Sequence, residues 1–299
     1  MYSRVKLIVR VMLISAGAAS VAAGQKAPSQ GRGTLMIVGG GPQPQALVQQ
    51  FVDLAGGRAK ARIIVFGMAS EDGEKAGEEK AQELRKLGAD ARSVWANNTQ
   101  ANTDSVARLL DGATGVWFVG GDQNKLVAAL RGTRTDSAMK ARYRAGAVIA
   151  GTSAGAAVMS AVMITGDERH PGGARTDSST GGFMTIARED IVVDSGFAFL
   201  RDAVVDQHFL RRKRHNRLIS VVLEDQPHLA AGIDESTALI VRPNGTWKVA
   251  GASVVIIYDA RHAKITPASR ATLGATDIRM HVLPAGSEFD PSTGVARLP

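Results

Sequence analysis

Ala147-Val-Ile-Ala-Gly-Thr-Ser-Ala-Gly-Ala156 joins a short apolar run to a serine that stands between two glycines. The first four residues are continuously apolar, which favours a buried strand over a half-exposed one. Residues 156–163 are apolar apart from Ser160 and predict a helix directly after the turn. Glycines two positions before and after Ser153 suit a tight strand-to-helix turn, because a missing Cβ lets the backbone beside a strained serine pass closely. The pattern is typical of a nucleophile elbow, so Ser153 is the candidate nucleophile.

Strand and helix signals alternate before this turn. The predicted strands are 35–38, 62–66, 93–95, 115–119 and 147–150, and the predicted helices are 44–54, 74–87, 103–110 and a stretch ending at Leu130. This alternation predicts a three-layer α/β sandwich with a mainly parallel sheet, and an active site at the carboxyl ends of its strands. From Leu239 to Tyr258, short strands around a Pro-Asn-Gly turn predict a β-rich C-terminal edge. Since no repeat or linker is visible, we expect residues 25–299 to form a single domain.

The composition excludes several kinds of chemistry. The chain has no cysteine, which rules out disulfides, a thiolate nucleophile and any cysteine-ligated metal. No histidine and carboxylate pair has the helical spacing that metal hydrolases use, so we expect no metal and no cofactor. A core must therefore hold the protein together, and 44% apolar residues are enough to build one.

The N-terminus has the features of a secretory signal peptide. Arg4, Lys6 and Arg10 precede the apolar run 11–19, and small residues at 20–24 offer a cleavage site. The apolar run is shorter than a bilayer-spanning helix needs, although a retained anchor is the alternative. We predict that 1–24 is removed, that the mature protein is periplasmic or extracellular, and that it is not held at a membrane. Cleavage lowers the net charge from +8 to about +5.

A serine nucleophile needs a general base and a group that orients the base. Among six histidines, His208 follows the apolar strand 203–205. This places it at the carboxyl end of a strand, where an active site belongs in this architecture. The orienting carboxylate stays open between Asp234 and Glu235, which follow another predicted strand.

The segment Gly120-Gly-Asp-Gln123 is a second predicted strand-to-helix turn. The backbone N–H of Gly121, together with that of Ala154 at the helix after the nucleophile, could form an oxyanion hole. The alternative is an ordinary turn in which Asp122 caps a helix.

Residues 211–217, Arg-Arg-Lys-Arg-His-Asn-Arg, concentrate positive charge just after His208. Three interpretations are open: the segment is a solvated helix face, it contacts nucleic acid, or its arginines bind substrate carboxylates in fork geometry. Because no aromatic residue is interleaved with them, we expect no nucleic-acid partner. The polar stretch 170–182 is either a surface insertion or a lid over the site.

Together these segments resemble the cyanophycinase branch of the S51 serine peptidases. The matching elements occur in family order, which makes a chance match improbable. They are Gly39-Gly-Gly41, Val119-Gly-Gly-Asp-Gln123, Gly151-Thr-Ser-Ala-Gly-Ala156, Asp206-Gln-His-Phe209 with Arg212, Arg214 and Arg217, and Gly232-Ile-Asp-Glu235. The insertion at 165–190 has no match.

The resemblance implies a flavodoxin-like, class I glutamine amidotransferase-like fold with a serine in place of the amidotransferase cysteine. It implies Ser153 as nucleophile, His208 as base and Glu235 as the orienting group. It further implies a set of substrate-binding residues, namely Gln123, Asp206, Gln207, Arg212, Arg214 and Arg217.

The substrate that the resemblance implies is cyanophycin, a polyaspartate that carries arginine on its β-carboxyls, with β-Asp-Arg dipeptide as the product and a homodimer as the assembly. The alternatives are an aspartyl dipeptidase of the same family, acting on small Asp-containing peptides, and a secreted, catalytically inactive polyanion-binding protein.

Overall fold

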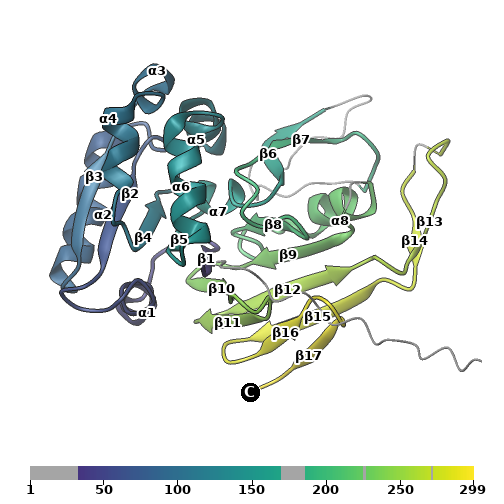
Figure 1. Cartoon of the computed structure of the whole chain (residues 1–299). Helices are drawn as coiled ribbons and strands as arrows, with labels where there is room; N and C mark the ends of the chain where they lie inside the picture. Colours follow the sequence, from purple (N-terminus) through teal and green to yellow (C-terminus); the bar gives the residue numbers. More distant parts are fainter. Residues whose placement is uncertain (1–32, 170–185, 225–226, 271) are drawn as a thin grey trace, which may run out of the picture.

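The computed structural model describes residues 33–169, 186–224, 227–270 and 272–299 (Figure 1). The predicted signal peptide at 1–24 and the predicted loop at 170–182 lie outside the described residues.

The centre of the fold is a nine-stranded sheet, half of which is parallel. Its parallel half has the order β1, β5, β4, β2, β3. These strands are β1 (Leu35–Val38), β5 (Val148–Thr152), β4 (Gly115–Phe118), β2 (Arg62–Phe66) and β3 (Asp90–Val94). Nearly every residue of β1, β4 and β5 is buried, which explains their continuous apolar sequences. The predicted mainly parallel sheet is confirmed.

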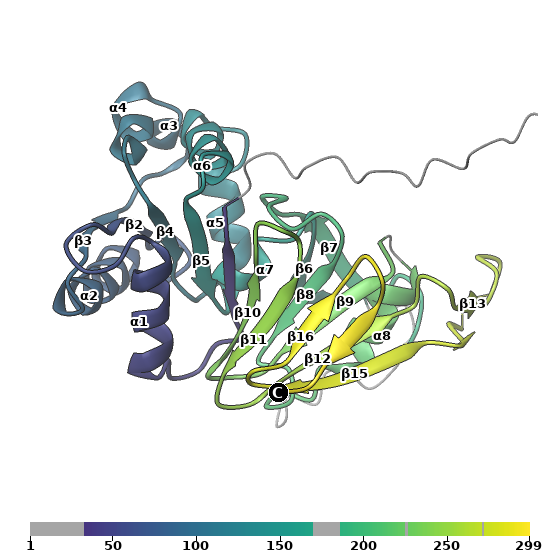
Figure 2. The same ribbon diagram turned by 60° about the horizontal axis from the view of Figure 1, so that its bottom comes forward.

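Helices cover both faces of this half (Figure 2). On one face lie α1 (Gln45–Leu54) and α2 (Gly73–Lys86), and on the other lie α5 (Gln123–Leu130) and α6 (Arg134–Arg144). The short helices α3 (Asn98–Ala101), α4 (Asp104–Ala107) and η1 (Arg108–Leu110) connect β3 to β4. Helix α6 escaped prediction because Met139 and Tyr143 are the only large apolar residues that it buries.

The C-terminal half adds antiparallel strands to the same sheet and builds a second sheet. Strand β10 (Thr237–Val241) pairs antiparallel with β1 and is followed in the sheet by β11 (Trp247–Gly251), β16 (Glu288–Asp290) and β17 (Val295–Arg297). The second sheet contains β15 (Arg279–Pro284), β12 (Val254–Asp259), β9 (Leu229–Ile233) and β8 (Val204–Gln207). Helix α8 (His215–Glu224) connects β8 to β9, and two hairpins pair β6 (Val162–Glu168) with β7 (Ile191–Ser195) and β13 (Lys264–Ile265) with β14 (Ala275–Thr276). The β-rich C-terminal edge is confirmed and is larger than expected.

The predicted helix at 156–163 is wrong. Helix α7 covers only Ala154–Ala157, and β6 already begins at Val162. The carbonyls of Val158 and Met159 accept hydrogen bonds from the backbone of the segment at 197–200. Both side chains are fully buried, so their apolar character reflects the core rather than a helix face.

Candidate active site

Ser153 sits on the sharp turn between β5 and α7. Its backbone has φ 55° and ψ −113°, which is a strained conformation for a residue with a side chain. A Cβ on Gly151 would lie 2.4 Å from the carbonyl oxygen of Gly155, and one on Gly155 would lie 2.4 Å from that of Phe118. The turn therefore requires both glycines, as the sequence pattern predicted.

Three segments bring Ser153, His208 and Glu235 together. The Nε2 atom of His208, just after β8, lies 2.8 Å from Ser153 Oγ. Its Nδ1 atom lies 2.7 Å from Glu235 Oε1, just after β9. The strand before His208 belongs to the second sheet, parallel to β9, rather than to the main sheet. This chain of hydrogen bonds has the geometry of a nucleophile, a base and an orienting carboxylate.

The neighbouring carboxylate, Asp234, faces another direction. Its Oδ1 accepts hydrogen bonds from the backbone N–H groups of Leu210 (3.1 Å) and Arg211 (3.2 Å). Its Oδ2 accepts one from the Ser253 hydroxyl at 2.8 Å. Asp234 thus holds the turn that follows His208, and of the two candidate carboxylates Glu235 is the one that contacts the imidazole.

The first glycine triplet, whose role the sequence left open, encloses the base and its partner. A Cβ on Gly40 (φ 103°) would lie 2.3 Å from Cε1 of His208, and one on Gly41 would lie 2.8 Å from Oε2 of Glu235. In the sequence, this role could have been suspected from three consecutive glycines at the carboxyl end of a predicted buried strand.

Burial keeps His208 neutral. Its side chain is 9% exposed, and desolvation lowers the pKa of His208 most strongly. The hydrogen bond to Glu235 opposes this change, while the positive charges of Arg212 and Arg214 lower the pKa further. A neutral imidazole can accept the serine proton at neutral pH.

The activity should therefore fall on the acid side at a pH below the ordinary pKa of histidine, because only the neutral base is competent. Arg212→Gln removes a positive charge that disfavours the imidazolium, so this acid limb should move to higher pH. The measurement is kcat/KM against pH, which reports the free enzyme. Arg211→Gln, one position away in the same exposed run, is the matched control, and an unmoved limb in the Arg212 variant contradicts the assignment.

Three of the predicted substrate-binding residues form a buried ion cluster. Arg217 donates from Nε to Asp206 Oδ2 at 2.7 Å and also pairs with Oδ1. Arg214 lies 3.5 Å from the same carboxylate and donates to the carbonyl of Gln207 at 2.7 Å. Asp206 and Arg217 are each 1% exposed. Burial and the neighbouring Arg217 lower the pKa of Arg214 to about 9, which leaves it charged at neutral pH. The cluster fixes the end of β8, and with it His208, to α8.

Asp206→Ala is expected to destabilise the protein by about 3–5 kcal/mol, because it leaves two buried guanidinium groups without their carboxylate. Chemical denaturation measures this loss. Asp202→Ala, an exposed aspartate four residues earlier, serves as the control and should change stability little. A stability equal to that of the wild type in the Asp206 variant would contradict the role of the cluster.

The other predicted substrate-binding residues divide between the interior and the surface. Gln123 is 7% exposed and donates to the carbonyls of Ile164 and Thr165, which ties α5 to β6. The side chain of Gln207 is buried, and its Oε1 has no partner among the described residues. Arg212 is exposed and is free to reach a ligand.

The turn at 120–122 lies beside the nucleophile. A Cβ on Gly120 would be 3.9 Å from Ser153 Oγ, and Gly121 (φ 138°) passes so close to Ala69 that a Cβ would lie 2.1 Å from its carbonyl. Asp122 caps α5 by accepting from Asn124 N at 2.8 Å. Within the described residues, the N–H groups of Gly121 and Ala154 have no backbone partner, which leaves both available to an oxyanion.

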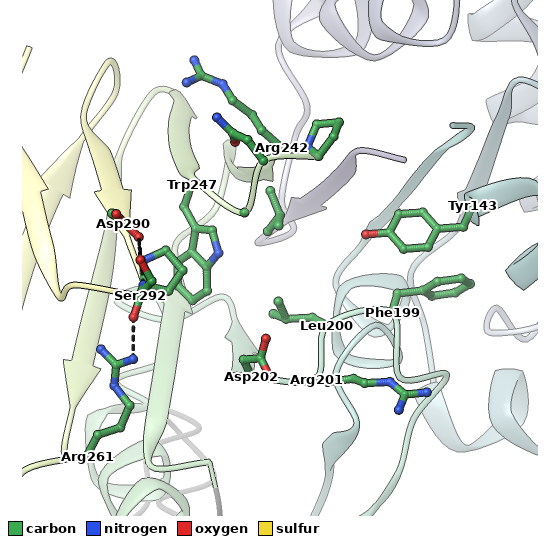
Figure 3. Close-up of a pocket in the computed structure, with 15 residues that line it drawn as sticks. Tyr143, Phe199, Leu200, Arg201, Asp202, Arg242, Trp247, Arg261, Asp290 and Ser292 are labelled. Carbon is green, nitrogen blue, oxygen red and sulfur yellow. Dashed lines mark hydrogen bonds between the residues drawn. The ribbon is translucent and has the colours of Figure 1, made fainter. Parts of the chain in front are cut away.

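A cavity lies away from this site. Its volume is about 320 Å³, and Figure 3 shows Trp247 on one side of it and Tyr143 on the other. Val241, which lines it, pairs with Leu35 at the start of β1, whereas the triad lies past the end of that strand. The cavity therefore lies at the amino end of β1, whereas Ser153 lies near its carboxyl end.

Neither a candidate metal-ligand cluster nor a membrane-spanning helix occurs in the described part of the chain. No group of three or more histidine, aspartate or glutamate side chains there could hold a metal ion. No helix there is long and apolar enough to cross a bilayer.

Known proteins resemble this chain in sequence and in fold. The model of peptidase family S51 matches residues 35–248, a range that includes Ser153, His208 and Glu235. The chain is 28% identical over 276 residues to a cyanophycinase of Trichormus variabilis, covering 88% of this chain and 87% of that protein. It is 29% identical over 274 residues to a cyanophycinase of Synechococcus elongatus, covering 88% and 80%. A solved peptidase from an acI-B1 Actinobacterium has the same fold, with a TM-score of 0.62 at 20% identity over 88% of this chain and 98% of that one.

Proposed function

The chain belongs to peptidase family S51 and is a peptidase, and from this premise we propose that it hydrolyses cyanophycin to β-Asp-Arg dipeptides through an acyl-enzyme on Ser153. The observation that carries the mechanism is the hydrogen-bond chain from Ser153 through His208 to Glu235. The cyanophycinases that it resembles over most of their length support the substrate.

In this mechanism Ser153 Oγ attacks the carbonyl carbon of the scissile bond while His208 Nε2 takes the hydroxyl proton. The N–H groups of Gly121 and Ala154 receive the negative charge that develops on the carbonyl oxygen. His208 then gives its proton to the leaving amine, and water hydrolyses the acyl-enzyme by the same route. Glu235 keeps the Nδ1–H tautomer and stabilises the imidazolium.

The surface beside the triad suits the charges of the substrate. Cyanophycin carries carboxylates as well as guanidinium groups, and the exposed cations Arg211, Arg212 and Lys213 begin three residues after His208. Their positive charge can attract and orient the carboxylates. The buried Asp206, Arg214 and Arg217 act behind this surface by fixing the base.

We also propose that the protein is exported by its N-terminal segment 1–24 and that it works as a homodimer. N-terminal sequencing of the protein recovered from its native cell envelope tests the first, since the mature chain should begin near residue 25. Sedimentation of the purified mature protein tests the second.

Incubation of the purified protein with insoluble cyanophycin, followed by identification of the soluble products, tests the proposed substrate. We expect β-Asp-Arg dipeptide to be released. Cleavage of small peptides with an N-terminal aspartate, without attack on the polymer, would instead identify an aspartyl dipeptidase. No cleavage of either substrate would favour a polyanion-binding protein.

A further inference from the structure

The loop at residues 39–43, here called the glycine loop, touches the segments of all three triad residues. The carbonyl of Gly39 accepts a hydrogen bond from the backbone N–H of His208 at 2.6 Å. The carbonyls of Gly40 and Pro42 accept from the N–H (2.9 Å) and the hydroxyl (2.6 Å) of Ser236, the residue after Glu235. The backbone of His208 and the residue that follows Glu235 are thus both held by carbonyl groups of one loop.

Gln43 supplies the corresponding side-chain link to the nucleophile. Its Nε2 donates to the carbonyl of Gly41 at 2.8 Å and to the hydroxyl oxygen of Thr152 at 3.3 Å. Thr152 is the residue directly before Ser153 and is itself 8% exposed. One amide group therefore joins the loop that encloses His208 and Glu235 to the turn that carries Ser153.

Lys80, on α2, sets the orientation of that amide. Its Nζ donates to Gln43 Oε1 at 2.8 Å and pairs with Glu83 at 2.5 Å. The Lys80 side chain is only 12% exposed and lies over the ring of Trp117, with Nζ 4.7 Å from the centroid. Because an ammonium group only donates, Gln43 must turn its oxygen toward Lys80 and its NH₂ toward Gly41 and Thr152.

The link borders open space beside the nucleophile. Gln43, Lys80 and Thr152 line a cavity of about 310 Å³ together with Gly120, where a Cβ would lie 3.9 Å from Ser153 Oγ. At the edge of a cavity, the Gln43 amide contributes little to stability by packing. Its hydrogen bonds to Gly41, Thr152 and Lys80 are therefore its main interactions.

We propose that Gln43 is a positioning residue of the peptidase reaction, which keeps Ser153 in register with His208 and Glu235, and that Lys80 acts through it by fixing its amide. The inference rests on the proposed function in that Ser153 is the nucleophile. Small displacements of a reacting atom are costly, and a misplacement of about 1 Å can lower a rate by roughly 100-fold.

The test is the second-order rate at which a fluorophosphonate labels Ser153, measured alongside kcat, KM and thermal unfolding. Labelling forms the bond from Ser153 Oγ to phosphorus with loss of fluoride and transfer of the serine proton to His208, so it needs the nucleophile and base but no peptide substrate. Gln43→Met keeps the length of the side chain and removes its donors. Lys80→Gln keeps a donor toward Gln43, whereas Lys80→Met removes it. Gln49→Leu, which loses only an exposed bond to Asp53 on α1, is the control.

We expect Gln43→Met to lower the labelling rate and kcat by about 10- to 100-fold with little change in KM. Lys80→Met should show a similar loss, whereas Lys80→Gln and the control should stay close to the wild type. Because Lys80 acts through Gln43, the double variant Gln43→Met/Lys80→Met should be no slower than Gln43→Met alone.

Labelling of Gln43→Met within about twofold of the wild type overturns the proposal, as does a double variant in which the two losses multiply. If Gln43→Met does not fold, the variants Lys80→Met and Lys80→Gln still test the proposal. Equal labelling rates for Lys80→Met and the wild type would overturn it. Failure of the substrate proposal is a separate result: Ser153 would be labelled normally and the Gln43 effect would persist, but cyanophycin would not be cleaved.

Discussion

Ser153→Ala is expected to lower kcat by roughly 10⁵- to 10⁶-fold, the loss seen when the nucleophile of a serine peptidase is removed. In the proposed mechanism the hydroxyl oxygen forms the acyl-enzyme and gives its proton to His208 Nε2, which lies 2.8 Å away. The proposed oxyanion donors, the N–H groups of Gly121 and Ala154, remain in the variant, so residual hydrolysis above that of water is expected.

The activities of the wild type and Ser153→Ala are compared by measuring how fast equal amounts of each release dipeptide from cyanophycin. The fold should survive, because alanine replaces serine without adding volume. Ser137→Ala on the exposed side of α6 is a matched control for the substitution itself. A Ser153 variant with more than a few per cent of the wild-type activity would contradict a covalent role.

Glu235→Gln is expected to lower kcat by about 10³- to 10⁴-fold, with KM nearly unchanged. The carboxylate accepts from His208 Nδ1 at 2.7 Å and stabilises the positive charge that the imidazole acquires during the reaction. A neutral amide of the same size cannot stabilise that charge as well, and it can donate toward Nδ1 and favour the wrong tautomer.

Asp234→Asn is the matched control, since it neutralises the adjacent carboxylate. Asp234 holds backbone N–H groups of the turn after His208, so this variant should lose some thermal stability but keep most of its kcat. Equal losses of kcat in the two variants would contradict the assignment of Glu235, and a reversed order would assign the role to Asp234.

The sequence was sufficient to predict the parallel half of the fold and to propose Ser153 and His208 as nucleophile and base. The reason is local: Ser153 and His208 each follow a short apolar strand, and the carboxyl ends of such strands are where side chains meet. Glu235 needed the resemblance to the family, because Asp234 occupies an equivalent place in the pattern and only the direction of the two side chains separates them.

Features that depend on pairing between distant segments were not predictable. The apolar residues Val158 and Met159 look like a helix, yet they belong to an irregular, buried connection between α7 and β6. Arg214 directly precedes α8 and Arg217 lies in its first turn, and both pair with the buried Asp206 instead of facing outward to a ligand. In the same way, a glutamine after three glycines gives no sign that Lys80, 37 residues later, will orient its amide.

The central claim is that Ser153 is a nucleophile activated by His208 and Glu235, and its most direct test is the site of covalent labelling by a fluorophosphonate, located by intact-mass analysis and peptide mapping. We predict one adduct per chain, on Ser153, which forms slowly or not at all in a His208→Ala variant. No adduct on the wild-type protein, or an adduct on a different residue, would contradict the claim.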